Sequence, residues 1–415
     1  MTVIFEKEKS AYRETRRAFW NRNSEIKGNS WGGYYHKRLK QVYRFVIPEG
    51  SSVLEVGCGH GDLLASLKPS YGVGVDFSER MIAVARERHP GLEFIVTDAH
   101  ELSLTGRTFD YIVISDLVND LWDVQAVLER LKSCCKPQTR IVFNYYSHLW
   151  GGVLRLAQKL GIATPTLPQN WLTRIDMVNL LELSGFQSLR SWKEIVFPLH
   201  IPFISGIANR YLSKISPFRF MSLTNFLVAR LRPQPRKDLP AVSVIVPARN
   251  EKGNIAELMT RIPEMGAGTE IIFVEGHSAD DTYATIEREI EKNPQRRCKL
   301  IKQLGRGKRD AVRLGFAEAS GDILMILDAD ITVPPENLTR FFNVIATREA
   351  EFVNGVRLVY PLQNGAMQLA NLVGNKFFSW SFSWLLGQPI RDTLCGTKVL
   401  WADDYRRLAD SRNYF

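Results

Sequence analysis

In both halves of this 415-residue chain, short apolar runs alternate with helix-length amphipathic segments, and the runs end in glycine or acidic residues. Such alternation is typical of βαβ units and of a mainly parallel sheet covered by helices. Between the halves, PQPRKDLP at 233–240 has three prolines and three charged residues in eight positions, which is the composition of a solvated linker. The sequence therefore predicts an α/β fold with two doubly wound domains, 1–232 and 241–415, joined by a linker at 233–240.

The charge balance narrows the class of partner. Lys and Arg number 54 against 44 Asp and Glu, a formal charge of +10, which favours an anionic partner such as phosphate, an acidic membrane surface or nucleic acid. The basic residues are dispersed and no segment resembles a nucleic-acid-binding module, so we expect no nucleic-acid partner. A membrane surface remains an alternative.

Cysteines and apolar stretches indicate the compartment. The five cysteines form no CxxC pair and no cluster with histidine, and the charged N-terminus lacks the apolar core of a signal peptide. No stretch approaches ~18 to 20 uninterrupted apolar residues, so we expect no spanning helix. The nearest, FPLHIPFISGIANRYL at 197–212, predicts a loop and helix, with membrane contact as the alternative. We expect a cytoplasmic protein, with peripheral contact at the inner face of the cell membrane as a further option.

A glycine-rich turn follows the first apolar run of the N-terminal half, SSVLEVGCGHGDLL at 51–64. Gly57, Gly59 and Gly61 allow a sharp turn and the close approach of a ligand, and the next helix offers free N–H groups. The following run, YGVGVD, ends at Asp76, nineteen residues after Gly57, where a carboxylate can accept both ribose hydroxyls of a nucleoside. Glu55 would repel phosphates, so the turn favours a cationic nucleoside cofactor over a dinucleotide. The alternative is that Glu55 bonds a helix N-terminus and Asp76 serves a turn.

Two further runs end in polar residues. LEFIVTDAHEL places Asp98 after a third strand, and FDYIVISDLVNDL places Ser115 and Asp116 at the end of a fourth. Open parallel sheets bind ligands at this carboxyl edge. With the four motifs in this order, residues 31–146 resemble a class I S-adenosylmethionine-dependent methyltransferase of the small-molecule type.

The resemblance implies that S-adenosylmethionine is the cofactor and that the segment WGGYYHKRL at 31–39 belongs to a helix that caps it. No residue identifies itself as a base for the methyl acceptor, although Asp116, Asn119 and His148 are candidates. By matching positions, the cofactor contacts are Glu55, Gly57, Gly59 and Gly61 at the methionine part, Asp76 at the ribose, Asp98 and Ala99 at the adenine, and Ser115 beneath the sulfonium.

In the C-terminal half, the buried run DILMILDAD at 322–330 stops on Asp328 and Asp330. Two carboxylates this close repel each other unless a cation lies between them, and a hard divalent ion with oxygen ligands is the usual solution. A solvated turn before a helix opened by Pro334 and Pro335 is the alternative. The preceding motifs, VSVIVPARNEKGNI, EIIFVEGHSADDT and QLGRGKRD, favour the metal.

With these motifs, residues 242 to about 409 resemble a family 2 glycosyltransferase of the GT-A fold, most closely the dolichol-phosphate or polyprenol-phosphate mannose and glucose synthases. The resemblance implies inverting transfer of a sugar from a nucleotide-sugar donor to a polyprenyl-phosphate or glycolipid acceptor, with Mg²⁺ or Mn²⁺ held by Asp328 and Asp330. Expected substrate contacts are Pro247, Arg249, Glu251, Glu275, Lys308, Asp328 and Lys398, and the expected catalytic residues are Asp330, Arg357 and Asp392.

Three departures from the family pattern stand out. Glu275 and His277 occupy positions where the family usually has paired aspartates, and Thr332 stands where close relatives have glutamine. The chain ends at SRNYF, roughly thirty to seventy residues before such a domain normally finishes, so we expect a C-terminally truncated glycosyltransferase. We therefore expect a bifunctional transferase. The alternatives are a glycan acceptor in place of a lipid phosphate, or one domain that only binds ligand and acts as a scaffold.

Overall fold

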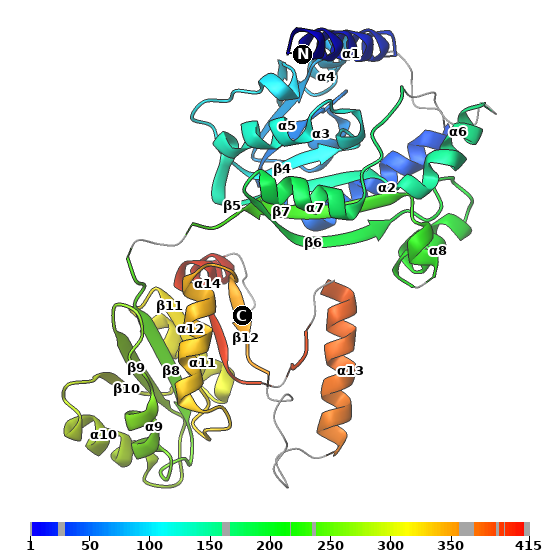
Figure 1. Ribbon diagram of the computed structural model, residues 1–415. Coiled ribbons are helices and arrows are strands. Elements are labelled where there is room, and N and C mark those ends of the chain that lie inside the picture. Colours follow the sequence, from blue (N-terminus) through cyan, green and yellow to red (C-terminus); the bar gives the residue numbers. More distant parts are fainter. Residues whose placement is uncertain are drawn as a thin grey trace. The chain divides into compact units, whose positions relative to one another are not determined.

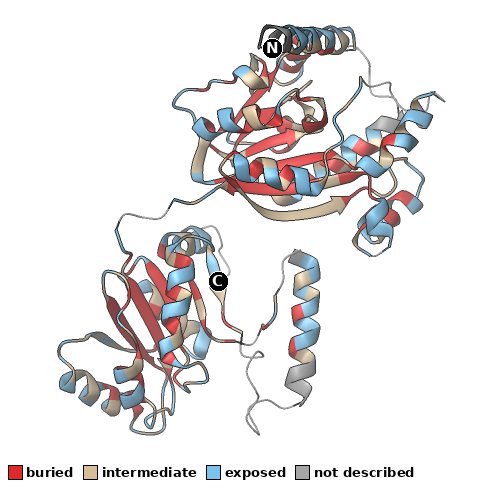
Figure 2. Ribbon diagram, in the orientation of Figure 1, coloured by how far each residue is buried: buried red, intermediate tan, exposed pale blue. Residues whose placement is uncertain are grey.

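The computed structural model describes residues 2–23, 30–159, 167–215, 217–234, 238–356, 369–386, 390–393 and 395–410. The chain divides into two compact units, 1–232 and 233–415. Each unit is built on its own mixed sheet with helices packed against it, which confirms the predicted α/β class (Figure 1). In both sheets the central strands are mostly buried (Figure 2).

The N-terminal unit has a seven-stranded sheet in the order β3-β2-β1-β4-β5-β7-β6. The first five strands are mutually parallel, and β7 is antiparallel to both of its neighbours, β5 and β6. The carboxyl ends of β1 to β4 therefore meet at one edge, as the sequence predicted. The strands are β1 Ser52–Val56, β2 Tyr71–Asp76, β3 Glu93–Val96, β4 Phe109–Ser115, β5 Cys135–Tyr146, β6 Phe186–Glu194 and β7 Thr224–Leu231.

Helices cover both faces of this sheet. Leu54 and Val56 pack in one hydrophobic cluster with α5 and α7, whereas Val53 packs in another with α2 and α3. Consecutive strand residues point to opposite faces, so the two clusters form the two sides of the core. The helices are α1 Thr2–Arg22, α2 Ser30–Val46, α3 Asp62–Ser66, α4 Glu79–Arg88, α5 Val124–Leu131, α6 Gly151–Lys159, α7 Arg174–Leu183 and α8 Ile204–Arg210.

The C-terminal unit has a six-stranded sheet in the order β10-β9-β8-β11-β13-β12. The strand expected at 323–327 is β11, all four residues of which are buried between β8 and β13. Strand β13 is antiparallel to β11 and β12, while the other pairs are parallel. The strands are β8 Val242–Ala248, β9 Thr269–Glu275, β10 Arg297–Lys302, β11 Ile323–Ile326, β12 Phe352–Asn354 and β13 Lys398–Trp401.

Six α-helices of this unit lie in the described residues, and a short 3₁₀ turn, η7 Pro335–Asn337, precedes α12 where the sequence predicted a helix start. No helix in the described part of the chain is both long and apolar enough to cross a membrane. The helices are α9 Ile255–Arg261, α10 Thr282–Lys292, α11 Lys308–Ala317, α12 Leu338–Ala346, α13 Leu369–Leu386 and α14 Ala402–Asp410.

Candidate functional site

The glycine-rich turn between β1 and α3 needs its glycines. Gly57, Gly59 and Gly61 have φ angles of 75°, 51° and 73°, in the left-handed region that side chains disfavour. A Cβ on Gly61 would lie 2.5 Å from the ring of Phe94, and one on Gly57 would lie 3.0 Å from Leu117. The turn therefore depends on glycine for both its backbone conformation and its packing.

Asp76 holds this turn from the end of β2. Its carboxylate accepts hydrogen bonds from the backbone N–H of Gly59 at 3.0 Å and of Ser78 at 2.9 Å. Burial raises its pKa, which these backbone hydrogen bonds oppose. Asp76 thus combines a turn-stabilising role with a position on the wall of a cavity.

That cavity lies at the carboxyl edge of the sheet, where the sequence predicted a cofactor. Strand ends and the turns that follow them supply one wall, and α1 supplies another. Of the predicted cofactor residues, those that line it are Gly57, Asp76, Asp98 and Ala99; Glu55, Gly59, Gly61 and Ser115 are not among the lining residues.

The helix α1 covers the cavity, which the sequence did not predict. Tyr12, Arg13, Arg16 and Trp20 all line it, whereas α2, which contains the expected capping segment 31–39, contributes no lining residue among its described side chains, 33–46. The four residues recur at helical spacing, so they share one face of α1. That spacing was visible in the sequence, but nothing in the sequence indicates that this face lies over the cavity.

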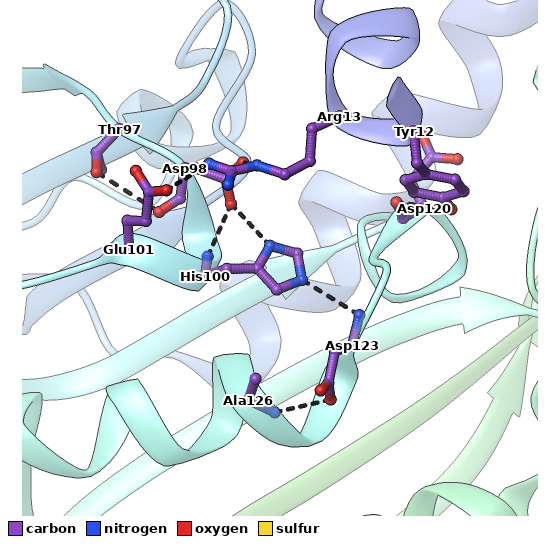
Figure 3. A network of polar contacts seen from close by, with 9 residues as sticks. All are labelled: Tyr12, Arg13, Thr97, Asp98, His100, Glu101, Asp120, Asp123 and Ala126. Carbon is purple, nitrogen blue, oxygen red and sulfur yellow. Dashed lines mark hydrogen bonds and ion pairs between the residues drawn. The ribbon is translucent and has the colours of Figure 1, made fainter. Parts of the chain in front are cut away.

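Asp98 is the centre of a charged network on the cavity wall (Figure 3). Its Oδ2 accepts from Arg13 Nε at 2.7 Å, and its Oδ1 accepts from the backbone N–H of His100 at 2.8 Å and lies 2.7 Å from His100 Nδ1. Arg13 also donates to Glu101, and the backbone N–H of Asp123 donates to His100 Nε2. Although burial acts in the opposite direction, His100 and Arg13 hold the pKa of Asp98 well below its usual value. Asp98 is therefore a carboxylate, and α1 is fastened to it.

Glu55 lies beneath the glycine turn. Its side chain is 2% exposed, and its Oε2 accepts from the backbone N–H of Leu64 in α3 at 3.0 Å. Burial raises its pKa to about 8. The structure thus places Glu55 as a helix-bonding residue, the alternative considered from the sequence.

Asp116 forms a second buried network where β4 ends. Its Oδ1 accepts from Tyr35 Oη at 2.8 Å and from Asn144 Nδ2 at 2.5 Å, and Tyr43 donates to Asn144 at 2.7 Å. Burial raises the pKa of Asp116 to about 7, despite the hydrogen bonds from Tyr35 and Asn144. Part of Asp116 nevertheless remains accessible to solvent. Asp116 therefore has the protonation equilibrium of a base near neutral pH.

The other two candidate bases lie differently. Asn119 is fully buried, donates to the Asn170 carbonyl at 2.6 Å and accepts from the Tyr146 backbone N–H at 3.0 Å. His148 is exposed in the turn before α6. Asn119 is committed to structural hydrogen bonds, which leaves Asp116 as the best placed of the three.

In the C-terminal unit, Asp328 and Asp330 follow β11 at the carboxyl edge. Lys308, the first residue of α11, forms an ion pair with Asp328 Oδ1, while Asp330 Oδ1 accepts from Thr332 Oγ1 at 2.9 Å. A Cβ on Gly396 would lie 1.9 Å from Asp328 Oδ2, so any larger residue there would force the Asp328 carboxylate to move. Lys308, which the sequence predicted to contact substrate, is thus in direct contact with Asp328.

The ends of β8 and β9 carry the residues expected at the nucleotide. Glu275, 7% exposed, accepts from the Ser278 backbone N–H at 2.6 Å, and Glu251 accepts from Asn254 Nδ2 at 2.7 Å. Pro247 is half-buried in β8 and Arg249 is exposed.

Gln303 was not singled out from the sequence. It is buried, donates its backbone N–H to the Glu275 carbonyl at 2.9 Å, and donates its side-chain amide to Asp310 Oδ2 at 2.9 Å. It therefore connects the end of β9 to the glycine turn before α11. A lone glutamine after a strand gives no signal of such a role.

Asp392 and Lys398 lie close to β13. Asp392 is fully buried, and its Oδ1 accepts from Asn375 Nδ2 of α13 at 2.9 Å and from the Cys395 backbone N–H at 3.1 Å. Lys398 donates to the Cys395 carbonyl at 2.7 Å, and burial lowers its pKa. Arg357 lies outside the described residues. Among those residues, no group of three or more His, Cys, Asp or Glu side chains is arranged to hold a metal ion.

Comparisons with known proteins identify both units. Residues 53–138 match the family described as methyltransferase domain, and residues 243–399 match glycosyl transferase family 2. The chain therefore carries a methyltransferase domain followed by a family 2 glycosyltransferase domain, which confirms the two predicted resemblances.

Curated relatives match the second domain. The chain is 37% identical over 106 residues to the dolichol-phosphate mannosyltransferase of Pyrococcus furiosus, covering 25% of this chain and 30% of that protein. It is 31% identical over 120 residues to the undecaprenyl-phosphate 4-deoxy-4-formamido-L-arabinose transferase of Sodalis glossinidius, covering 28% and 36%. The chain thus spans about a third of the length of these relatives.

Solved methyltransferases also match part of the chain. The magnesium protoporphyrin IX methyltransferase of Synechocystis, solved with bound SAH, is 18% identical and matches 48% of this chain and 83% of its own, with a TM-score of 0.34.

Proposed function

We propose that the chain is a bifunctional transferase. The N-terminal unit transfers a methyl group from S-adenosylmethionine, and the C-terminal unit transfers a sugar from a nucleotide-sugar to a polyprenyl-phosphate type of acceptor with the help of a divalent ion. The observation that carries the first activity is the cavity at the carboxyl edge, walled by Gly57, Asp76 and Asp98. For the second it is the pair Asp328 and Asp330 after β11, together with the family 2 match.

The cavity offers suitable partners for each part of a nucleoside sulfonium. Asp76 can accept the ribose hydroxyls, and Asp98 is an ionised acceptor for an exocyclic amino group. Aromatic side chains of α1, Tyr12 and Trp20, line the same cavity and can pack on a purine. The chain's own residues thus bind and enclose the cofactor, which itself supplies an electrophilic methyl group.

Calorimetric titration with S-adenosylmethionine tests this part. We expect Asp76→Asn to weaken binding at least about ten-fold, because a charged acceptor for two hydroxyls is lost. The control is Glu87→Gln, an equivalent acid-to-amide change on the exposed face of α4, which we expect to leave binding unchanged. Thermal unfolding of both variants separates lost binding from lost folding. Equal affinity in wild type and Asp76→Asn would argue against this cofactor pose.

The pair Asp328 and Asp330 fits a divalent cation. Both supply hard carboxylate oxygens, and for the Oδ2 atom of each the described part of the chain provides no hydrogen-bond donor. When bound there, Mg²⁺ or Mn²⁺ neutralises the departing nucleotide diphosphate. Lys308, which pairs with Asp328, supplies a further positive charge for the phosphates. A lipid phosphate has a second pKa of about 6 and needs no dedicated base to act as nucleophile.

Helix α13 supports a membrane-borne acceptor. Its polar side chains Asn375, Ser379 and Ser383 face residues 390–393 of the same unit through hydrogen bonds. The rest of the helix surface exposes large apolar side chains, which is typical of a surface that meets another apolar phase. They are Phe377, Phe378, Trp380, Phe382, Trp384 and Leu385. We therefore include peripheral contact with the inner face of the membrane in the proposal.

Incubation with UDP- and GDP-sugars, polyprenyl phosphate and Mg²⁺, followed by mass analysis of the lipids, tests the second activity. We expect Asp328→Asn with Asp330→Asn to abolish the glycosylated lipid. The control is Asp403→Asn, at an exposed aspartate of α14. A product formed only on added glycans would favour a glycan acceptor. Ligand binding without turnover in either unit would favour the scaffold alternative.

A further inference from the structure

The segment between β6 and β7 forms a lobe with an inverted distribution of polarity. We define the α8 lobe as residues 197–221 without Ser216; it contains α8 and two 3₁₀ turns, Leu212–Lys214 and Phe218–Met221. Figure 2 shows exposed residues along α8. A surface helix normally buries its apolar side and exposes its polar side. In the α8 lobe the two sides are exchanged.

The polar side chains of the lobe point inward. Asn209 accepts from the Phe197 backbone N–H at 2.9 Å and donates to the Phe197 carbonyl at 2.7 Å. Ser205 donates to the Leu199 carbonyl at 2.5 Å, and Ser213 donates to the Asn209 carbonyl at 2.8 Å. All three polar side chains are 1% exposed. Their hydrogen bonds fix the lobe internally, so it keeps its shape without an apolar core of its own.

The apolar side chains of the lobe point outward. Phe203 is 88% exposed, although its φ of 62° already places a bulky residue in the left-handed region. Neither its packing nor its backbone conformation favours this position in water. The remaining exposed large side chains of the lobe are Ile201, Ile204, Ile207, Tyr211, Ile215, Phe218, Phe220 and Met221.

The charge of the lobe is of one sign. Its 25-residue span, 197–221, contains no Asp or Glu and contains Arg210, Lys214 and Arg219. Arg210 and Arg219 are exposed, whereas Lys214 pairs with Glu194. Lys193 lies 5.8 Å from the ring centroid of Phe220, at the margin of the lobe.

We propose that the α8 lobe docks the methyltransferase unit onto an anionic lipid bilayer. Apolar side chains mixed with cations and free of carboxylates suit the boundary between acyl chains and phosphate headgroups. A second copy of the chain fits less well, because a two-fold contact would place the same cations opposite one another.

The lobe also contacts α2, whose next residue bonds the candidate base Asp116. Asn209 donates to Tyr34 Oη at 3.2 Å, and the Tyr34 ring lies 5.4 Å from that of His200. The next residue, Tyr35, donates to Asp116. The lobe and the candidate base thus contact neighbouring residues of α2, which, on the proposed function, suits a methyl acceptor carried on a lipid headgroup.

Vesicle co-sedimentation of the full chain tests the docking surface. We expect binding to vesicles of phosphatidylcholine with phosphatidylglycerol and little binding to phosphatidylcholine alone. Phe203→Ser with Ile207→Ser should lower the apparent affinity at least about ten-fold, because two exposed apolar side chains no longer enter the bilayer. Arg210→Gln should lower it by about five-fold. The control is Leu183→Ser, at an exposed leucine of α7 outside the lobe, which should bind like wild type.

Helix α13 could retain part of the binding, so a local probe completes the test. A polarity-sensitive dye on Phe203→Cys should report an apolar environment when anionic vesicles are added, above the signal of identically treated wild type. No vesicle binding, unchanged binding by the double serine variant, or a dye that stays in water would each refute the proposal. A dimer that the serine variant dissociates, without vesicle binding, would assign the lobe to a second copy instead. Titration of S-adenosylmethionine in solution should be unaffected, which separates this proposal from the proposed function.

Discussion

The buried carboxyl of Glu55 makes the stability of the methyltransferase unit depend on pH. Burial raises its pKa from 4.5 to about 8, so the folded state binds this proton more tightly than the unfolded state. A group with a raised pKa contributes stability that is fully present below pH 4.5 and is lost as the pH rises through about 8. Wild type should therefore become less stable between these two values.

The size of the effect follows from the two pKa values. Each unit by which the pKa rises corresponds to about 1.36 kcal/mol in the free energy of unfolding. The rise from 4.5 to about 8 therefore corresponds to about 5 kcal/mol. Glu55→Gln does not ionise and keeps an oxygen that can accept from Leu64 N–H. Asp116, whose pKa is also raised, is present in both proteins and cancels in the comparison, whereas the repulsion between Asp76 and Glu55 is part of the effect that is measured. Relative to Glu55→Gln, wild type should lose several kcal/mol, up to about 5, from about pH 5 to pH 9.

Pulse proteolysis in urea, with peptides of β1 detected by mass spectrometry, measures the free energy of unfolding of this unit alone. The measurement is made for wild type and Glu55→Gln from about pH 5 to pH 9. The test uses only how the difference in free energy of unfolding between the two proteins changes with pH. A constant difference caused by the substitution itself therefore does not affect the result. A difference that stays constant within about 1 kcal/mol, or one that increasingly favours wild type at high pH, would show that Glu55 is ionised in the folded protein.

Three further substitutions have defined outcomes. Arg13→Gln removes the charged contact to Asp98 that fastens α1, so SAH should dissociate about ten-fold faster in stopped-flow measurements and trypsin should cleave α1 sooner. Gly61→Ala combines a φ of 73° with a contact of 2.5 Å to an aromatic ring, so calorimetry should show the methyltransferase unit destabilised by about 2 kcal/mol or more. Gly396→Ala would bring a methyl group to 1.9 Å from Asp328, so glycosyl transfer should be lost while S-adenosylmethionine binding is kept.

The sequence predicted the parallel strands β1 to β4, β8, β9 and β11, because each is a short apolar run followed by a turn with glycine or polar residues. It did not single out β5 or β10, which carry more polar residues. It did not predict that the N-terminal sheet closes with the antiparallel strand β7 inserted between β5 and β6, since long loops precede it. Pairing between distant strands depends on tertiary packing and leaves no local pattern. The same holds for the contact of α1 with the cavity.

For single side chains, the sequence predicted which strand end carries each residue but not the direction in which its side chain points. Glu55 and Asp76 both end a strand beside the same turn, yet one bonds α3 beneath the turn and the other lines the cavity. Successive side chains of a strand point to opposite faces, and the glycine turn then decides which carboxylate is covered. The different orientations of Glu55 and Asp76 depend on a few backbone dihedral angles of the turn. Glycine can adopt many such angles, so the sequence alone does not specify them.

In both units, a cation of the chain occupies a carboxylate that the proposed ligand would engage. Arg13 pairs with Asp98 where an adenine amino group would bind, and Lys308 pairs with Asp328 where a metal ion would bind. A shielded carboxylate without a partner is costly, so each cation stabilises its site before the ligand arrives. A bound metal ion would replace Lys308 at Asp328, and Lys308 could then turn to the diphosphate. An adenine amino group would share Asp98 with Arg13, which also contacts Glu101. In each unit, we therefore expect a cation of the chain to keep the binding carboxylate in place until the ligand arrives.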